Sequence, residues 1–191
     1  MIRRRAFGLL LGAGVGATAL LIAPLTADAT GATSNISGGS LSFVNAPGNV
    51  TFNTTLNGTN QVATTPQSFD VGDSTGSGSG WNITATSTSF TTGGAIPHVL
   101  ANDSVSIQAI GVPSASCDNN VTCTTASNGI TYPYSLPADT SAPTASKVFN
   151  AAVDTGLGNQ SLTPAWSLSL PANTYAGTYT STWTFSLVSG P

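Results

Sequence analysis

Residues 178–187 read Thr-Tyr-Thr-Ser-Thr-Trp-Thr-Phe-Ser-Leu, and this stretch indicates the fold most clearly. The odd-numbered positions include Tyr179, Trp183, Phe185 and Leu187, while every even-numbered position carries Thr or Ser. Successive side chains of a strand point to opposite faces. The stretch therefore predicts a strand of an antiparallel sheet, with one apolar, buried face and one face of hydroxyls.

The same alternation recurs along the chain, whereas sustained helical periodicity does not. The other expected strands are residues 50–56, 81–85, 105–109 and 166–170. Turn signals such as Asn57-Gly58 and Pro171 separate them. Short strands between turns predict an all-β fold, an antiparallel β-sandwich of the immunoglobulin-like kind in a single domain.

The spacing of these signals is looser in residues 111–160. Proline-rich stretches predict long surface loops with an edge strand in this region. Residues 145–153 place Ala145, Val148, Phe149 and Ala152 at helical spacing, which predicts a brief helix.

The first 29 residues carry the features of an export signal. Arg3, Arg4 and Arg5 precede an apolar stretch over residues 7–25, and Ala27-Asp28-Ala29 forms a small-residue cleavage site. We expect residues 1–29 to be a signal peptide and residues 30–191 to be the secreted domain. Arg4-Arg5 also resembles a twin-arginine signal, so the sequence leaves the export route open.

The secreted part is almost uncharged. It contains one cation, Lys147, against six aspartates and no glutamate, a net charge of −5. Nucleic acid requires clustered Lys and Arg, and so does electrostatic docking on anionic lipids or anionic wall polymers. The composition argues against these partners and predicts that any wall polymer is held by hydrogen bonds and apolar stacking.

Cys117 and Cys123 are the two cysteines of the chain. Two nearby cysteines in an exported protein predict a disulfide, and closing so short a loop contributes ~2.4 kcal/mol. A metal or redox pair is the alternative, but the spacing is not Cys-x-x-Cys and His98 is the only histidine.

Catalysis and metal binding find little support in the residue types. The aspartates lie mostly in turn contexts, and no Gly-x-Ser-x-Gly nucleophile signature accompanies His98. Asp70 to Thr75 offers oxygens at alternate positions, but it lacks the closing glutamate of a calcium loop. We therefore expect no enzyme, no catalytic residue, no metal and no cofactor.

Two segments resemble the WxL domain family. Residues 76–84, which end in Trp81-Asn82-Ile83-Thr84 and follow Asp70-Val71-Gly72-Asp73, are similar to the family's proximal Trp-x-Leu segment. Residues 175–191 are similar to its distal segment, which ends in a proline, and residues 38–42 to its opening strand. The resemblance spans the secreted chain and implies a bacterial surface protein bound non-covalently to peptidoglycan.

The resemblance places candidate binding residues at Trp81, Ile83, Trp183, Phe185 and Leu187. Ile83 replaces the family's Leu, and Phe185 takes the place of the distal Trp when the segments are aligned on Leu187. Two interpretations stay open. The aromatic rings pack inside the sandwich, or Trp81 or a neighbour is exposed and stacks on a sugar face.

The sequence thus predicts a secreted protein of the cell wall or cell surface, attached without covalent linkage or membrane insertion. No Leu-Pro-x-Thr-Gly sorting signal, lipidated cysteine or C-terminal apolar tail is visible. The expected partners are peptidoglycan or another wall glycan, with other surface proteins as a further class. A coat or fimbria-like subunit that assembles through sheet edges is the alternative, and a water-ordering Thr-rich surface is a weaker third hypothesis.

Overall fold

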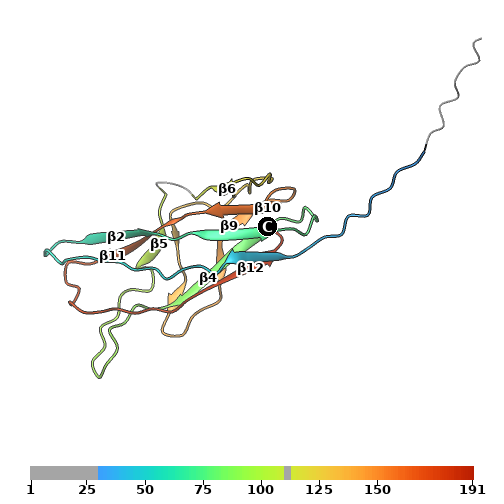
Figure 1. Ribbon diagram of the computed structural model, residues 1–191. Helices are drawn as coiled ribbons and strands as arrows, with labels where there is room; N and C mark the ends of the chain where they lie inside the picture. Colours follow the sequence, from blue (N-terminus) through green and yellow to red (C-terminus); the bar gives the residue numbers. More distant parts are fainter. Residues whose placement is uncertain (1–29, 110–112) are drawn as a thin grey trace, which may run out of the picture. The chain divides into compact units, whose positions relative to one another are not determined.

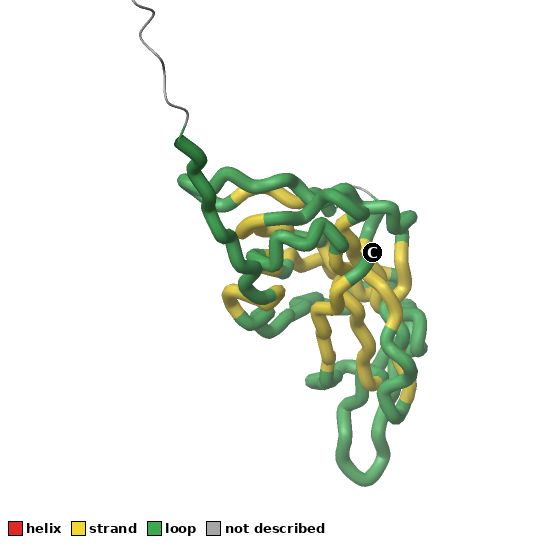
Figure 2. Tube along the Cα trace, turned by 90° about the vertical axis from the view of Figure 1, so that its right-hand side faces the viewer, coloured by secondary structure: helices red, strands yellow, loops and turns green. Residues whose placement is uncertain are grey.

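A computed structural model describes residues 30–109 and 113–191 (Figure 1). The predicted signal peptide, residues 1–29, lies outside the described residues. Residues 30–35 are exposed and form no strand. Residues 36–191 form one unit, and its described residues contain twelve strands. Figure 2 shows strands and loops but no helix in this described part. In this part of the chain, no helix is long and apolar enough to cross a membrane.

The strands form three sheets (Figure 1). Sheet A has the order β1 (Leu41–Asn45), β3 (Phe69–Asp73), β10 (Gly158–Leu162), β6 (Ala115–Cys117). Sheet B has the order β2 (Gln61–Pro66), β11 (Ala165–Leu170), β5 (Val105–Ile107), β7 (Tyr134–Ser135). Sheet C has the order β12 (Trp183–Ser189), β4 (Trp81–Thr88), β8 (Ala138–Asp139), and β9 (Ser146–Ala151) also pairs with β4.

The pairing is antiparallel except between β4 and β8, and the sheets pack through aromatic side chains. Phe185 of sheet C lies 5.0 Å, centroid to centroid, from Phe69 of sheet A and 6.1 Å from Trp166 of sheet B. Trp183 meets Trp166 edge-on at 5.0 Å. One face of β12 thus packs against both other sheets, which confirms the predicted β-sandwich.

The strand predicted at 178–187 is confirmed only in its second half. β12 begins at Trp183, and before it Thr180 forms an isolated bridge with Thr91. Within β12 the alternation holds, because Trp183, Phe185 and Leu187 are half-buried while Thr184 and Ser186 are exposed. Strands at 81–85, 105–109 and 166–170 are confirmed as β4, β5 and β11, although β5 ends at Ile107.

Two predicted elements are wrong. Residues 50–56 form no strand, although Val50 and Phe52 do pack against the core. Residues 145–153 contain strand β9 instead of a helix. Phe149 pairs with Ile83, and Lys147 pairs with its neighbour Thr84, so Val148 is an extra residue at a bulge. The bulge buries Val148 and Phe149 together, which produced the spacing that imitates a helix.

The region 111–160 contains more structure than predicted. It contributes β6 to β10, of which β6 and β7 lie at sheet edges while β10 is an inner strand of sheet A. A disulfide joins Cys117 and Cys123, the pairing expected from the sequence.

Candidate functional site

The proximal motif lies in the core. Trp81 and Ile83 lie on β4, which has partners on both sides, and both side chains are 0% exposed. The Trp81 indole nitrogen donates to the Gly156 carbonyl oxygen at 3.0 Å, and its ring lies 5.8 Å from that of Phe149. Gly156 has a φ of +84°, and a Cβ there would overlap the Trp81 indole. The interpretation that Trp81 is exposed to stack on a sugar is therefore wrong.

The distal motif lies nearer the surface. Trp183, Phe185 and Leu187 are half-buried and pack against the core. The first two also line a pocket of about 370 Å³. The structure thus separates the five candidate residues into two buried side chains and three that lie at the edge of the core.

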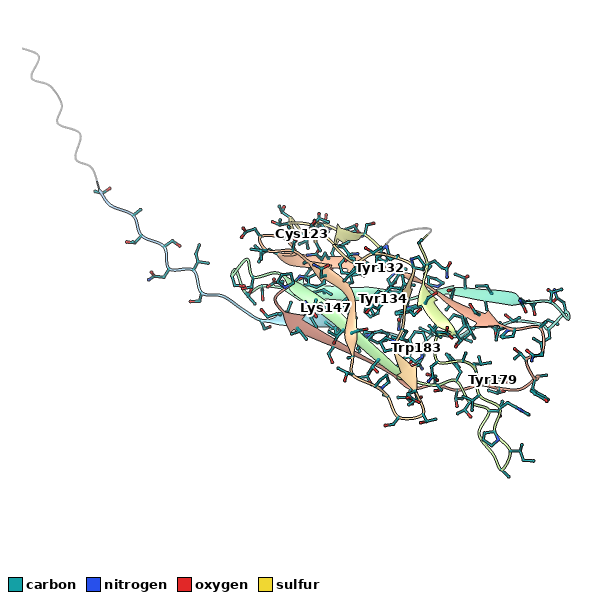
Figure 3. The ribbon with its side chains drawn as sticks, turned by 180° about the vertical axis from the view of Figure 1, so that it is seen from behind. Cys123, Tyr132, Tyr134, Lys147, Tyr179 and Trp183 are labelled. Carbon is teal, nitrogen blue, oxygen red and sulfur yellow. A yellow bond between two sulfur atoms is a disulfide. The ribbon has the colours of Figure 1, made fainter. Side chains whose placement is uncertain are left out.

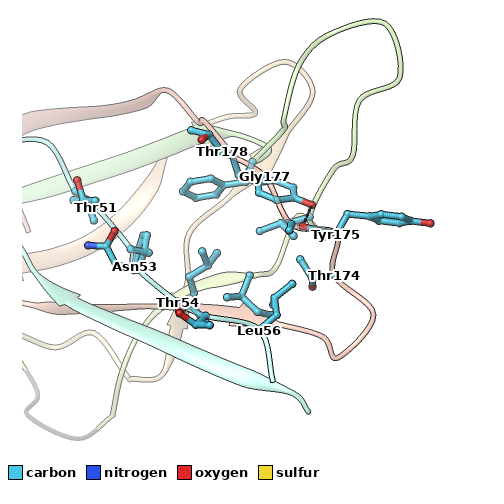
Figure 4. Close-up of a pocket in the computed structure, with 17 residues that line it drawn as sticks. Thr51, Asn53, Thr54, Leu56, Thr174, Tyr175, Gly177 and Thr178 are labelled. Atoms are coloured by element: carbon cyan, nitrogen blue, oxygen red, sulfur yellow. Dashed lines mark hydrogen bonds between the residues drawn. The ribbon is translucent and has the colours of Figure 1, made fainter. Parts of the chain in front are cut away.

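A second pocket, of about 750 Å³, lies beside the first. Residues 51–56 run along one side of it and residues 174–178 along the other (Figure 4). Its apolar floor consists of Phe90, Leu100, Leu168 and Leu170. The two pockets share four lining residues, Val50, Thr51, Phe90 and Tyr179. We call the two pockets together the groove.

Two glutamine side chains fix the segment that forms one wall of the groove. Gln67 is 6% exposed, donates to the Gly48 carbonyl at 2.7 Å and accepts from the Trp166 indole nitrogen at 2.9 Å. Gln61 donates to the Thr55 carbonyl at 2.9 Å. These bonds anchor residues 48–55 at both ends, although the segment belongs to no sheet.

The opposite wall carries an exposed aromatic residue. Tyr175 is 63% exposed, and Figure 4 shows its ring projecting outward at the mouth of the groove. One ring face stacks on His98, with centroids 3.8 Å apart and planes 9° apart. Tyr179 donates through its hydroxyl to the Tyr175 carbonyl at 3.0 Å, which fixes the backbone beneath that ring.

The lining of the groove is uncharged. No Asp, Lys or Arg lines either pocket. Lys147, the only cation among the described residues, donates through its ammonium group to the backbone oxygen of Pro191. Figure 3 shows Lys147 and Tyr179 in separate parts of the domain. The groove therefore offers hydroxyls, amides and apolar surface, but no charge.

The residues weighed for metal binding have other roles. Asp73 is buried and accepts from the Thr75 backbone N–H at 3.0 Å and from its hydroxyl at 2.7 Å, so it stabilises a turn. Within residues 30–109 and 113–191 no three His, Cys, Asp or Glu side chains cluster as metal ligands would.

Sequence reasoning missed the groove. Its walls come from segments more than a hundred residues apart, and neither segment carries a charged residue that would mark it as a site. The sequence did contain one signal, the alternation at 50–56: Val50 and Phe52 pack against the core, and Thr51 between them is exposed.

Comparison with known proteins gives one match. The family model described as WxL domain surface cell wall-binding matches residues 25–191, nearly the whole chain. No curated protein and no solved structure matches.

Proposed function

Because the chain belongs to the WxL domain family, described as a surface cell-wall-binding domain, we propose that it is a secreted bacterial protein that attaches non-covalently to peptidoglycan. The observation that carries this proposal is the extent of the family match. Residues 25–191 include every described residue, so the wall-binding domain accounts for the whole of the described fold.

The charge distribution supports attachment by neutral contacts. Lys147 donates to the backbone oxygen of Pro191, and the described residues hold no second Lys or Arg that could pair with phosphate or carboxylate groups of a wall polymer. Exposed ion pairs weaken as salt shortens the Debye length, whereas burial of apolar surface does not. Attachment of this protein should therefore persist in salt.

The cysteine pair supports export. Disulfides persist in oxidising compartments such as the cell exterior and are rare in the cytosol. The bond between Cys117 and Cys123 therefore agrees with residues 1–29 acting as a signal peptide. The family is described by wall binding and not by a reaction, which supports a binding role without catalysis.

A pull-down with purified wall sacculi tests the proposal. The secreted protein is mixed with sacculi at low and at high salt, and the pellet is compared with that of an unrelated acidic protein of similar size. We expect the protein to sediment with the sacculi at both salt concentrations. Failure to sediment at low salt contradicts wall attachment, and loss at high salt contradicts attachment by neutral contacts.

Assembly through sheet edges is the second candidate function, and one observation favours it. β2 lies at the edge of sheet B, and its Val62 side chain is 62% exposed. Unpaired edge strands with apolar side chains promote association. Size-exclusion chromatography separates the two functions, because a coat or fimbria-like subunit forms polymers while a wall-binding domain stays monomeric until peptidoglycan is added.

A further inference from the structure

We propose that the groove is the wall-binding site and that it takes the uncharged, N-acetylated sugar backbone of a wall glycan, with Asn53 and Tyr175 as its contact residues. This inference rests on the proposed attachment to peptidoglycan and adds the place and the ligand chemistry.

The shape of the groove suits a polymer of small rings. Ligand pockets usually measure about 300–1,000 Å³, and the two pockets of the groove measure about 750 and 370 Å³. Because they share Val50, Thr51, Phe90 and Tyr179, they adjoin along the segment that the two glutamines anchor. Adjoining pockets of this size offer neighbouring positions to successive sugar units.

Several polar groups of the groove are free to bind a ligand. The structure shows no hydrogen bond within the described chain from the side chains of Thr51, Asn53, Thr54 or Thr178. All four are exposed. Hydroxyl groups both donate and accept, and an amide does the same through separate atoms. This combination matches the hydroxyl and acetamido groups of an N-acetylated sugar.

The apolar groups of the groove match the rest of such a sugar. Phe90, Leu100 and Leu170 form a floor for the ring C–H groups and the acetyl methyl. Tyr175 adds a rigid, mostly exposed ring at the mouth, and aromatic rings supply contact area at small cost in conformational entropy. An apolar floor beneath a few polar groups is the usual composition of a ligand pocket.

Charge excludes the other main class of wall polymer. A polymer of phosphodiesters requires Arg or Lys for bidentate or point-charge recognition. None lines the groove, and burying a phosphate against its apolar floor without a partner is costly. The lining therefore favours neutral sugar over anionic polymer.

The groove is formed before any ligand arrives. Gln67 connects the Gly48 carbonyl to the buried Trp166 indole, and Phe52 packs edge-on against Phe90 at 6.2 Å. A wall held by hydrogen bonds and packing loses little entropy when a ligand binds, which raises affinity for a given set of contacts.

An NMR titration of the isotope-labelled secreted protein with the tetramer of N-acetylglucosamine tests the inference. We expect shifts to concentrate in residues 50–56 and 174–181. Tyr175→Ala and Asn53→Ala should each weaken binding, Tyr175→Ala by roughly threefold to tenfold. Thr184→Ala is the matched control, because Thr184 is an exposed residue of β12 that lines neither pocket, and it should bind as wild type.

Thermal unfolding and competition with a phosphate polymer distinguish loss of binding from loss of folding, and sugar recognition from anion recognition. Each variant changes an exposed side chain, so its thermal midpoint should match that of the wild type. A glycerol-phosphate polymer should neither shift these residues nor displace the tetramer. Sacculus binding that survives both substitutions, or displacement of the tetramer by the phosphate polymer, overturns the groove assignment and leaves wall attachment standing. Failure of the wild type to bind sacculi overturns the proposed function itself.

Discussion

Replacing Trp81 by alanine should lower the stability of the domain and should not remove a ligand contact. The indole is 0% exposed, packs on Phe149 and donates to the Gly156 carbonyl. Truncating a buried Trp to Ala costs about 3–5 kcal/mol. This is a large part of the ~5–15 kcal/mol by which domains are usually stable, and it lowers the midpoint of a domain of this size by about 6–20 °C.

Trp81→Phe separates the two parts of this cost. Phenylalanine keeps most of the contact with Phe149 but leaves the buried Gly156 carbonyl without its donor, which costs about 1–3 kcal/mol. Ile96→Ala is the control, because Ile96 is 82% exposed and its truncation should change stability by less than ~0.5 kcal/mol.

Guanidinium unfolding followed by tryptophan fluorescence gives the stability of the wild type and the three variants, and the sacculus pull-down at 4 °C gives binding by the folded fraction. We expect the stabilities in the order wild type, Trp81→Phe, Trp81→Ala, with equal binding by all folded protein. A Trp81→Ala domain with the wild-type midpoint and no sacculus binding would refute the reasoning, because it would place the indole at the ligand.

Three further outcomes are expected. Gln67→Met deprives the buried Trp166 indole of its acceptor, so urea unfolding should show a loss of about 1–3 kcal/mol; an unchanged midpoint would contradict the anchoring role. Intact mass after alkylation of native, unreduced protein should show no modified thiol, and two modified thiols would disprove the disulfide between Cys117 and Cys123. Burial raises the pKa of Tyr132, whose hydroxyl donates to the Val148 carbonyl. The hydroxyl therefore stays protonated in the folded domain at a pH at which the same tyrosine ionises in the unfolded chain. This contribution to stability is full below pH ~10 and is lost as the pH rises through the raised pKa. Absorbance at 295 nm should show one tyrosine that ionises after the others and that disappears in Tyr132→Phe.

The sequence predicted the fold class because alternation reports burial directly. It misassigned residues 50–56 for the same reason. Phe52 faces Phe90 and Trp183 as a strand residue would, but the backbone around it pairs with no neighbouring strand. Alternation shows which side chains are covered and does not show which backbone groups are paired.

The candidate site was predicted less well, because a short motif does not show how far its side chains are buried. Trp81 and Trp183 occur in similar local sequences, yet β4 has partners on both sides while β12 lies at the edge of sheet C. The inner strand buries the Trp81 ring, whereas the edge strand leaves the Trp183 ring at the wall of a pocket. The groove also depends on hydrogen bonds from Gln61 and Gln67 to backbone carbonyls up to 19 residues away. No sequence pattern predicts these bonds.

The pairing of β4 with β12 joins distant parts of the chain. Trp81 lies opposite Ser189, and Ser87 opposite Trp183, so this partner of β4 lies about a hundred residues later in the chain, whereas its other partners, β8 and β9, come earlier. β2 and its partner β11 are similarly far apart in the chain, since Gln61 pairs with Leu170. Such distant pairings fold slowly, because the loop between the strands is closed before their contacts form. Residues 158–189 supply one strand to each of the three sheets, namely β10, β11 and β12, so no sheet is complete until the last fifth of the chain is present.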